Sequence, residues 1–237
     1  MVAIITGASR GIGFETARYF ARLKDMEIYA LSRNMAGLGQ LATECAGLNK
    51  SSNLHPLVFD LDAFLNDPGS LRRRLPSTIR HIDILINNAG VLINKPFPQT
   101  TYEEMELLFR VNLFAPAMLI RELLPLMGNG QTTHVVNISS MGGFQGSMKF
   151  PGLSYYSSSK ASLACLTECL NEEFRESDIA FNCLALGSVQ TEMLEEAFPG
   201  YKAALQPAEM AEFIGHFALT AHKQMRGKVV PVSMVNP

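Results

Sequence analysis

The chain has 237 residues, of which 47% are hydrophobic, and its formal net charge at pH 7 is −2. This size and composition fit one globular domain over residues 1–237, and the balanced charge argues against a surface for nucleic acid or for an anionic membrane. The N-terminus lacks a secretory leader, no apolar run could span a membrane, and the scattered histidines and cysteines lack zinc-site spacing, so we expect a cytoplasmic protein that holds no metal.

Short apolar runs typical of buried strands alternate along the chain with segments of helical periodicity. The predicted strands occupy residues 2–6, 27–32, 54–61, 83–87, 134–140, 179–186 and 228–232. The predicted helices occupy residues 13–23, 35–48, 102–127, 156–176 and 207–219. This alternation predicts an α/β fold, a doubly wound parallel seven-stranded sheet with helices on both faces, which binds ligands at the carboxyl ends of its strands.

Three glycines stand between the first predicted strand and the first predicted helix, in the stretch TGASRGIG at residues 6–13. Gly7, Gly11 and Gly13 allow backbone conformations that other residues avoid and remove side chains that would keep a ligand away. The start of a helix offers free backbone N–H groups and a partial positive charge, which suit a phosphate. The spacing G-xxx-G-x-G differs from the best-known dinucleotide pattern, so a plain strand-to-helix turn is the alternative.

The second predicted strand ends in ALSRN and carries no carboxylate, which NAD-binding folds commonly place there to hold the ribose 2′-hydroxyl. Arg33 occupies that place, and Arg10 lies within the glycine turn. Because a guanidinium binds a phosphate through two hydrogen bonds, the two arginines favour NADP(H) over NAD(H). The alternative is that Arg33 only caps a surface loop.

Tyr156 and Lys160 are spaced four residues apart and fall on one face of a predicted helix. A free phenol has a pKa of about 10, and a nearby ammonium is expected to lower the pKa of Tyr156 so that it exchanges a proton with a carbonyl or alcohol oxygen. Ser140 ends a strand just upstream and is placed to hydrogen-bond the same oxygen. The stretch NNAG, at residues 87–90, closes another strand with polar side chains and a glycine turn.

Together, TGASRGIG, NNAG, Asn112, Ser140 and the Tyr156–Lys160 pair resemble the short-chain dehydrogenase/reductase family, over residues 2 to 232. The resemblance implies a Rossmann fold with the strand order 3-2-1-4-5-6-7 and a nicotinamide cofactor. Within the family, the chain resembles NADP-dependent carbonyl reductase and 3-oxoacyl-ACP reductase-like members.

The resemblance also implies roles for residues at matching positions. The catalytic set would be Asn112, Ser140, Tyr156 and Lys160. The cofactor-binding set would be Gly7, Ser9, Arg10, Gly11, Ile12, Gly13, Arg33, Asp60, Leu61, Asn87, Ala89, Gly90, Tyr156, Lys160, Gly187, Val189 and Thr191. In this family the main-chain carbonyl of Asn112 would bind a water that relays protons. Pro116 lacks an N–H, so we expect it to leave that carbonyl without its helical partner.

Two departures from the family pattern concern the active site. Ser140 and Tyr156 are 16 residues apart, more than is usual, which leaves open whether Ser139 or Ser140 polarises the carbonyl. The usual Pro-Gly after the sixth strand is replaced by Leu186 and Gly187, so that loop is expected to be less rigid. Eight apolar residues are candidates for the lining of a substrate pocket, and the alternative is that they only pack within a lid. They are Met141, Phe144, Met148, Phe150, Leu153, Met193, Leu194 and Phe198.

The leading interpretation is an NADPH-dependent reductase that converts a ketone, an aldehyde or a 3-oxoacyl group to an alcohol. The alternatives are a non-catalytic NADP(H)-binding regulator and an NAD-linked alcohol dehydrogenase of the same fold. We expect a homodimer or homotetramer built on the helices at 102–127 and 156–176. Cys165 and Cys169, on the second of these helices, are expected to pack in the core.

Overall fold

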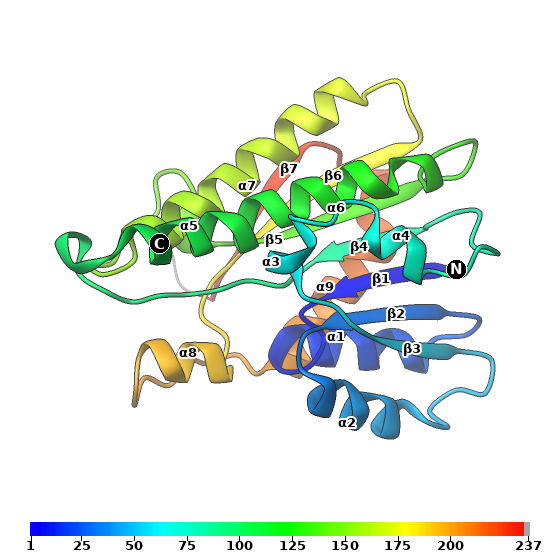
Figure 1. The fold of residues 1–237 in the computed structure, drawn as a ribbon, viewed down its shortest axis with the longest axis horizontal. Coiled ribbons are helices and arrows are strands. Elements are labelled where there is room, and N and C mark those ends of the chain that lie inside the picture. Colours follow the sequence, from blue (N-terminus) through cyan, green and yellow to red (C-terminus); the bar gives the residue numbers. More distant parts are fainter. Residues whose placement is uncertain (235–237) are drawn as a thin grey trace.

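The computed structural model describes residues 1–234, which form a seven-stranded parallel sheet with helices on both of its faces (Figure 1). The strands lie in the order β3-β2-β1-β4-β5-β6-β7, which confirms the predicted doubly wound fold. The strands are β1 (Val2–Thr6), β2 (Glu27–Ser32), β3 (Asn53–Val58), β4 (Ile84–Asn87), β5 (Thr133–Ser140), β6 (Ile179–Leu186) and β7 (Lys228–Val232). The α-helices are α1 (Gly11–Arg22), α2 (Met35–Cys45), α3 (Leu61–Phe64), α4 (Ser70–Arg74), α5 (Tyr102–Phe109), α6 (Ala115–Leu123), α7 (Ser154–Glu173), α8 (Glu192–Ala197) and α9 (Pro207–Thr220).

The central strands are mostly apolar because helices cover both of their faces. All residues of β4 and β6 are buried, whereas the edge strands β3 and β7 are partly exposed. Pro56 and Pro231 lie in those two edge strands, where a missing N–H interrupts no central ladder. Strand β3 ends at Val58 rather than at the predicted 61, because the side chain of Asp60 caps α3 instead.

Each face of the sheet has its own hydrophobic core. Helices α1, α2 and α9 cover one face, where Phe20 and Ile214 are buried against the strands. Helices α4, α6 and α7 cover the other face, where Leu119 and Phe181 are buried. In the part of the chain that is described, no helix combines the length and the apolar character needed to cross a bilayer.

The predicted continuous helix over residues 102–127 is interrupted. Helix α5 passes into a single π turn, η2 (Arg110–Phe114), before α6 begins, and the short turn η3 (Leu124–Leu126) follows α6. Within the π turn, the N–H of Ala115 donates to the carbonyl of Arg110, five residues back. Pro116 stands in the first turn of α6, where its missing N–H is tolerated. The proline therefore fixes where the helix restarts, and periodicity alone could not predict this.

The prediction that Cys165 and Cys169 pack in the core is wrong, because both side chains are exposed. Helix α7 buries a different face, which includes Lys160, Leu163 and Thr167. The prediction failed because it took the apolar cysteines to mark the buried face, whereas the face that α7 buries is partly polar.

Candidate active site

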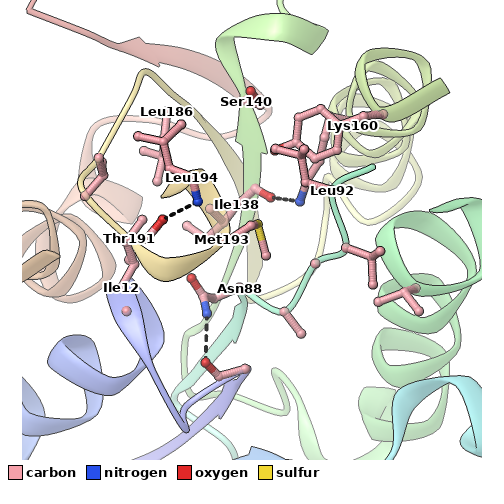
Figure 2. A pocket seen from close by; sticks show the side chains of 18 of the residues that line it. Ile12, Asn88, Leu92, Ile138, Ser140, Lys160, Leu186, Thr191, Met193 and Leu194 are labelled. Carbon is pink, nitrogen blue, oxygen red and sulfur yellow. Dashed lines mark hydrogen bonds between the residues drawn. The ribbon is translucent and has the colours of Figure 1, made fainter. Parts of the chain in front are cut away.

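A cavity of about 810 Å³ lies at the carboxyl ends of the central strands (Figure 2). Its walls come from the turn after β1, the ends of β2, β4, β5 and β6, helix α7 and helix α8. Sequence reasoning identified many of its lining residues: Gly7, Ser9, Arg10, Gly11, Ile12, Arg33, Asp60, Leu61, Ala89, Gly90, Ser140, Tyr156, Lys160, Gly187, Val189 and Thr191. Three other candidates, Gly13, Asn87 and Asn112, do not line it.

The turn after β1 is held against the loop after β4. Gly7 and Gly11 have φ angles of +70° and +58°, in the left-handed region that glycine tolerates best. The Thr6 hydroxyl accepts hydrogen bonds from the backbone N–H groups of Asn88 and Ala89, both at 3.0 Å. The Asn88 amide donates to the Thr6 carbonyl at 2.9 Å. These bonds fix the glycine turn at the cavity edge, and the second asparagine of NNAG makes two of the three.

Gly13 and Asn87 serve the scaffold and do not contact the cavity. A Cβ on Gly13 would overlap the Gly7 carbonyl oxygen and the Asn88 amide, so this glycine lets α1 pack on the turn. Asn87 is buried in β4, and its amide donates to Asn137 of β5 at 2.8 Å. Both residues belong to the predicted motifs, and their contact with the cofactor stays a prediction, because a motif does not reveal which residues line a cavity.

The two arginines at the cavity differ in whether their side chains have an ion-pair partner. The Arg33 side chain has no hydrogen-bond or ion-pair partner among residues 1–234, and it is exposed. Arg10 is paired with Glu196 of α8, with 2.6 Å between Nη1 and Oε1. Between them, the Ser32 hydroxyl donates to the Ser9 hydroxyl at 2.8 Å, which joins the end of β2 to the glycine turn.

Lys160 is buried beside the cavity, with 4% of its surface exposed. Its Nζ donates to the carbonyl of Ile138 at 2.9 Å, which is drawn in Figure 2. A Cβ on Gly90 would lie 3.2 Å from the same nitrogen, so the glycine of NNAG leaves room for the amine. Burial lowers the pKa of Lys160 to about 8, because the surrounding protein solvates an ammonium poorly.

The expected lowering of the Tyr156 pKa by Lys160 is not found. Burial raises the pKa of Tyr156, and a hydrogen bond with the Ser140 hydroxyl acts in the opposite direction. The Lys160 ammonium donates to the Ile138 carbonyl. Desolvation of the phenolate therefore outweighs the attraction that sequence reasoning had assumed.

The two serines at the end of β5 have different partners. The Ser139 hydroxyl is buried and donates to the main-chain carbonyl of Lys160 at 2.7 Å. The Ser140 hydroxyl accepts from the N–H of Gly142 at 3.2 Å and acts to lower the pKa of Tyr156. Because side chains alternate along a strand, only one of the pair can face Tyr156, and the geometry favours Ser140.

Asn112 is fully buried in the π turn and clamps the loop after β4. Its Oδ1 accepts from the N–H of Val91 at 2.8 Å, and its Nδ2 donates to the carbonyl of the same residue at 2.9 Å. Its Nδ2 also donates to Ser159 of α7 at 3.0 Å. The side chain thus ties the loop that carries Val91, which lines the cavity, to the helix that carries Tyr156 and Lys160.

The remaining cavity wall is mostly apolar. Of the eight apolar candidates, seven line it: Met141, Met148, Phe150, Leu153, Met193, Leu194 and Phe198. Phe144 does not, because it follows the short turn η4 (Met141–Gly143), whose glycines pack closely on α7. Leu92, Val111 and Tyr201 also line the cavity and were missed, since they lie outside every recognised motif. Figure 2 shows Met193 and Leu194 of α8 on the same side as Leu186.

Comparison with known proteins agrees with this architecture. The family model for short chain dehydrogenases matches residues 1–202. Dehydrogenase/reductase SDR family member 7B of Mus musculus is 30% identical over 81% of this chain, and the match spans 58% of the mouse protein.

Two solved structures are also similar. A protein from Beutenbergia cavernae, described as an NAD(P)-dependent gluconate 5-dehydrogenase with bound NADP, has a TM-score of 0.86 and 27% identity, covering 98% of this chain and 94% of that one. A short chain dehydrogenase from Escherichia coli CFT073, complexed with NADPH, has a TM-score of 0.86 and 26% identity, covering 97% and 95%. The chain therefore belongs to the short-chain dehydrogenase family.

Proposed function

We propose that the protein is an NADPH-dependent oxidoreductase that reduces a carbonyl group to an alcohol. The observation that supports this best is the meeting of the glycine turn, Ser140, Tyr156 and Lys160 around one cavity. The NADP and NADPH bound to the two similar structures support the cofactor assignment. The sheet, the cavity and α8 would act together as one domain over residues 1–237.

The residues present fit a dinucleotide phosphate. A Cβ on Gly7 would lie 2.8 Å from the Cα of Ala89, and one on Gly11 would lie 3.3 Å from Thr191, so only glycines leave this cradle open. Ser9 and the backbone of the glycine turn would hold the pyrophosphate, and Arg10 and Arg33 would hold the 2′-phosphate. The other contacts would come from Asp60 and Leu61 at the adenine and from Lys160 at the nicotinamide ribose. When bound, the nicotinamide supplies the hydride.

Tyr156 would donate the proton to the substrate oxygen. Its raised pKa keeps the phenol protonated at neutral pH, which suits a donor in the direction of reduction. Ser140, which lines the same cavity as the phenol, would also donate to the substrate oxygen as negative charge develops there. The Lys160 ammonium has three donors and uses one on Ile138, so two remain for a ribose and for orienting the proton path. Asn112 would act by positioning the loop and α7.

The substrate would be an apolar ketone, aldehyde or 3-oxoacyl compound. The wall near Tyr156 consists largely of methionine, leucine and phenylalanine side chains, which adapt to varied apolar groups. Met148 and Phe150 are 63% and 51% exposed, so the substrate end of the cavity is open to solvent. An opening of this kind suits substrates with an extended apolar tail.

A panel of carbonyl compounds assayed with NADPH and with NADH tests this proposal. NADPH oxidation that depends on a carbonyl compound supports it. Equal or better turnover with NADH, or alcohol oxidation with NAD alone, would favour an NAD-linked alcohol dehydrogenase. Tight NADPH binding without turnover of any compound would favour a regulator. A homodimer or homotetramer and a cytoplasmic location stay predictions, and light scattering on the purified chain tests the first.

Replacing Arg33 with glutamine is predicted to weaken NADPH binding roughly ten-fold or more, because two charge-assisted hydrogen bonds to a phosphate are lost. NADH lacks that phosphate, so its dissociation constant should change less than about two-fold. Fluorescence titration of both cofactors measures the two constants. Arg22→Gln, in the last turn of α1 and outside the cavity, is the control for the change in charge. Equal weakening of NADPH and NADH by Arg33→Gln would contradict the assignment.

A further inference from the structure

Helix α8 (Glu192–Ala197) lies beside the cavity and is attached on two sides. On one side, Glu196 pairs with Arg10 of the glycine turn. On the other side, the Asn94 amide donates to the carbonyl of Ala197 at 2.8 Å. The Thr191 side chain caps the helix by accepting from the N–H of Leu194, a bond drawn in Figure 2. Figure 1 shows α8 at the carboxyl end of the sheet, beside the beginning of α1.

The contact between Arg10 and Glu196 uses both terminal nitrogens of the guanidinium group. Nη1 lies 2.6 Å from Oε1, and Nη2 lies 3.4 Å from Oε2. This two-point arrangement is the one a guanidinium also uses for a phosphate. The carboxylate therefore occupies two of the five N–H donors of Arg10, in the paired arrangement that a phosphate would also use. Arg33, on the same cavity wall, has no such partner among the described residues.

The Glu196 carboxylate stands in the way of a phosphorylated ligand that would bind Arg10. Before Arg10 can bind a phosphate with its fork, the contact with Glu196 must open or be shared. A second α8 carboxylate, Glu192, also interacts electrostatically with Arg10. Opening the contact removes the attachment of α8 to the glycine turn and leaves the one at Asn94.

We propose that Glu196 is a specificity-determining residue that competes with the cofactor's 2′-phosphate for Arg10. Binding of the 2′-phosphate releases α8 from the glycine turn, whereas a cofactor without this phosphate leaves the contact closed. This inference rests on the proposed function, because it takes the cavity as an NADP(H) site. Arg10 and Arg33 create the preference for NADP(H), and Glu196 of α8 lowers it.

The expected size of the effect follows from the exposure of the pair. The Arg10 and Glu196 side chains are 46% and 64% exposed, so their attraction is screened by water. Exposed pairs of this kind correspond to roughly a two- to five-fold change in an equilibrium constant. Removing the competitor should therefore strengthen NADPH binding about two- to five-fold and leave NADH binding unchanged.

Binding titrations of the full chain test the proposal. Wild type, Glu196→Gln and Glu195→Gln are titrated with NADPH, NADH, adenosine 2′,5′-bisphosphate and 5′-AMP by calorimetry. Glu195→Gln removes the same charge from the same helix, but its carboxylate contacts Gly200 and Gln190 instead of Arg10. Only Glu196→Gln should bind the two 2′-phosphorylated ligands more tightly, with the other two unchanged.

The remaining outcomes overturn the inference in distinguishable ways. If wild type binds NADPH and Glu196→Gln binds it equally or more weakly, competition is refuted while the proposed function stands. If Glu196→Gln binds NADPH and NADH more tightly by the same factor, or if Glu195→Gln shows the same gain in affinity, the effect comes from the change in net charge. Either result also refutes competition. A wild type that binds none of the four ligands refutes the proposed function and this inference together.

Hydrogen exchange of the α8 amides gives a second readout that does not depend on turnover. In wild type, adenosine 2′,5′-bisphosphate should speed exchange over residues 192–197 relative to 5′-AMP, because the contact with Arg10 opens. In Glu196→Gln the two ligands should give the same exchange. Slower exchange with the bisphosphate in wild type would mean that phosphate and carboxylate share Arg10, which contradicts competition.

Discussion

Replacing Tyr156 with phenylalanine is expected to lower kcat for carbonyl reduction by roughly a hundred- to ten-thousand-fold, the range that a positioned proton donor contributes. The phenol lines the cavity together with Ser140, so the variant removes the proton donor and leaves the ring in place. The dissociation constant for NADPH should change less than about two-fold, since the glycine turn and the arginines are untouched. Steady-state kinetics and fluorescence titration measure the two effects separately.

The neighbouring tyrosine supplies a matched control. Tyr155 stacks on Phe97, with ring centroids 5.2 Å apart, and does not line the cavity. Tyr155→Phe removes the same hydroxyl one residue away and should leave kcat within about two-fold of wild type. Activity that survives in Tyr156→Phe, or a matching loss in Tyr155→Phe, would remove Tyr156 from the proposed mechanism.

Much of the sheet could be predicted from the sequence because its central strands are buried on both faces. A strand such as β6, with every residue buried, is apolar along most of its length, with the hydrogen-bonded Asn182 as the exception, and such runs are visible without coordinates. Once those strands are parallel, their carboxyl ends meet at one edge. Ser140 and the glycine turn could therefore be assigned to one site although they lie more than a hundred residues apart.

Features that depend on the direction of a side chain could not be predicted in the same way. Asn87 and Asn88 are adjacent in NNAG, yet one bonds β5 and the other holds the glycine turn. The pKa of Tyr156 depends on how much water reaches the phenol, and the spacing to Lys160 carries no such information. The contact between Arg10 and Glu196 joins residues 186 positions apart through a helix of six residues, too short for periodicity to reveal.

Gly13 is a motif glycine for which the structure indicates a packing role. It lies in the first turn of α1, outside the cavity, where a Cβ would overlap the Gly7 carbonyl oxygen. The obstructing atom belongs to the backbone of the glycine turn, which Asn88 and Thr6 hold in place. No side-chain rotation can relieve the overlap, so α1 and the turn must separate.

Gly13→Ala is accordingly expected to destabilise the protein by about 3 kcal/mol, at the upper end of the usual cost of overpacking. Gly39→Ala is the matched control, because Gly39 lies in α2 with no atom within 4 Å of the added Cβ. There the same change should stabilise by roughly 0.5–1 kcal/mol, through the lower entropy of the unfolded chain. Urea unfolding followed by circular dichroism measures both values. If Gly13→Ala unfolds at the wild-type urea concentration but binds NADPH weakly, Gly13 acts on the cofactor directly, and the packing role assigned to it here is wrong.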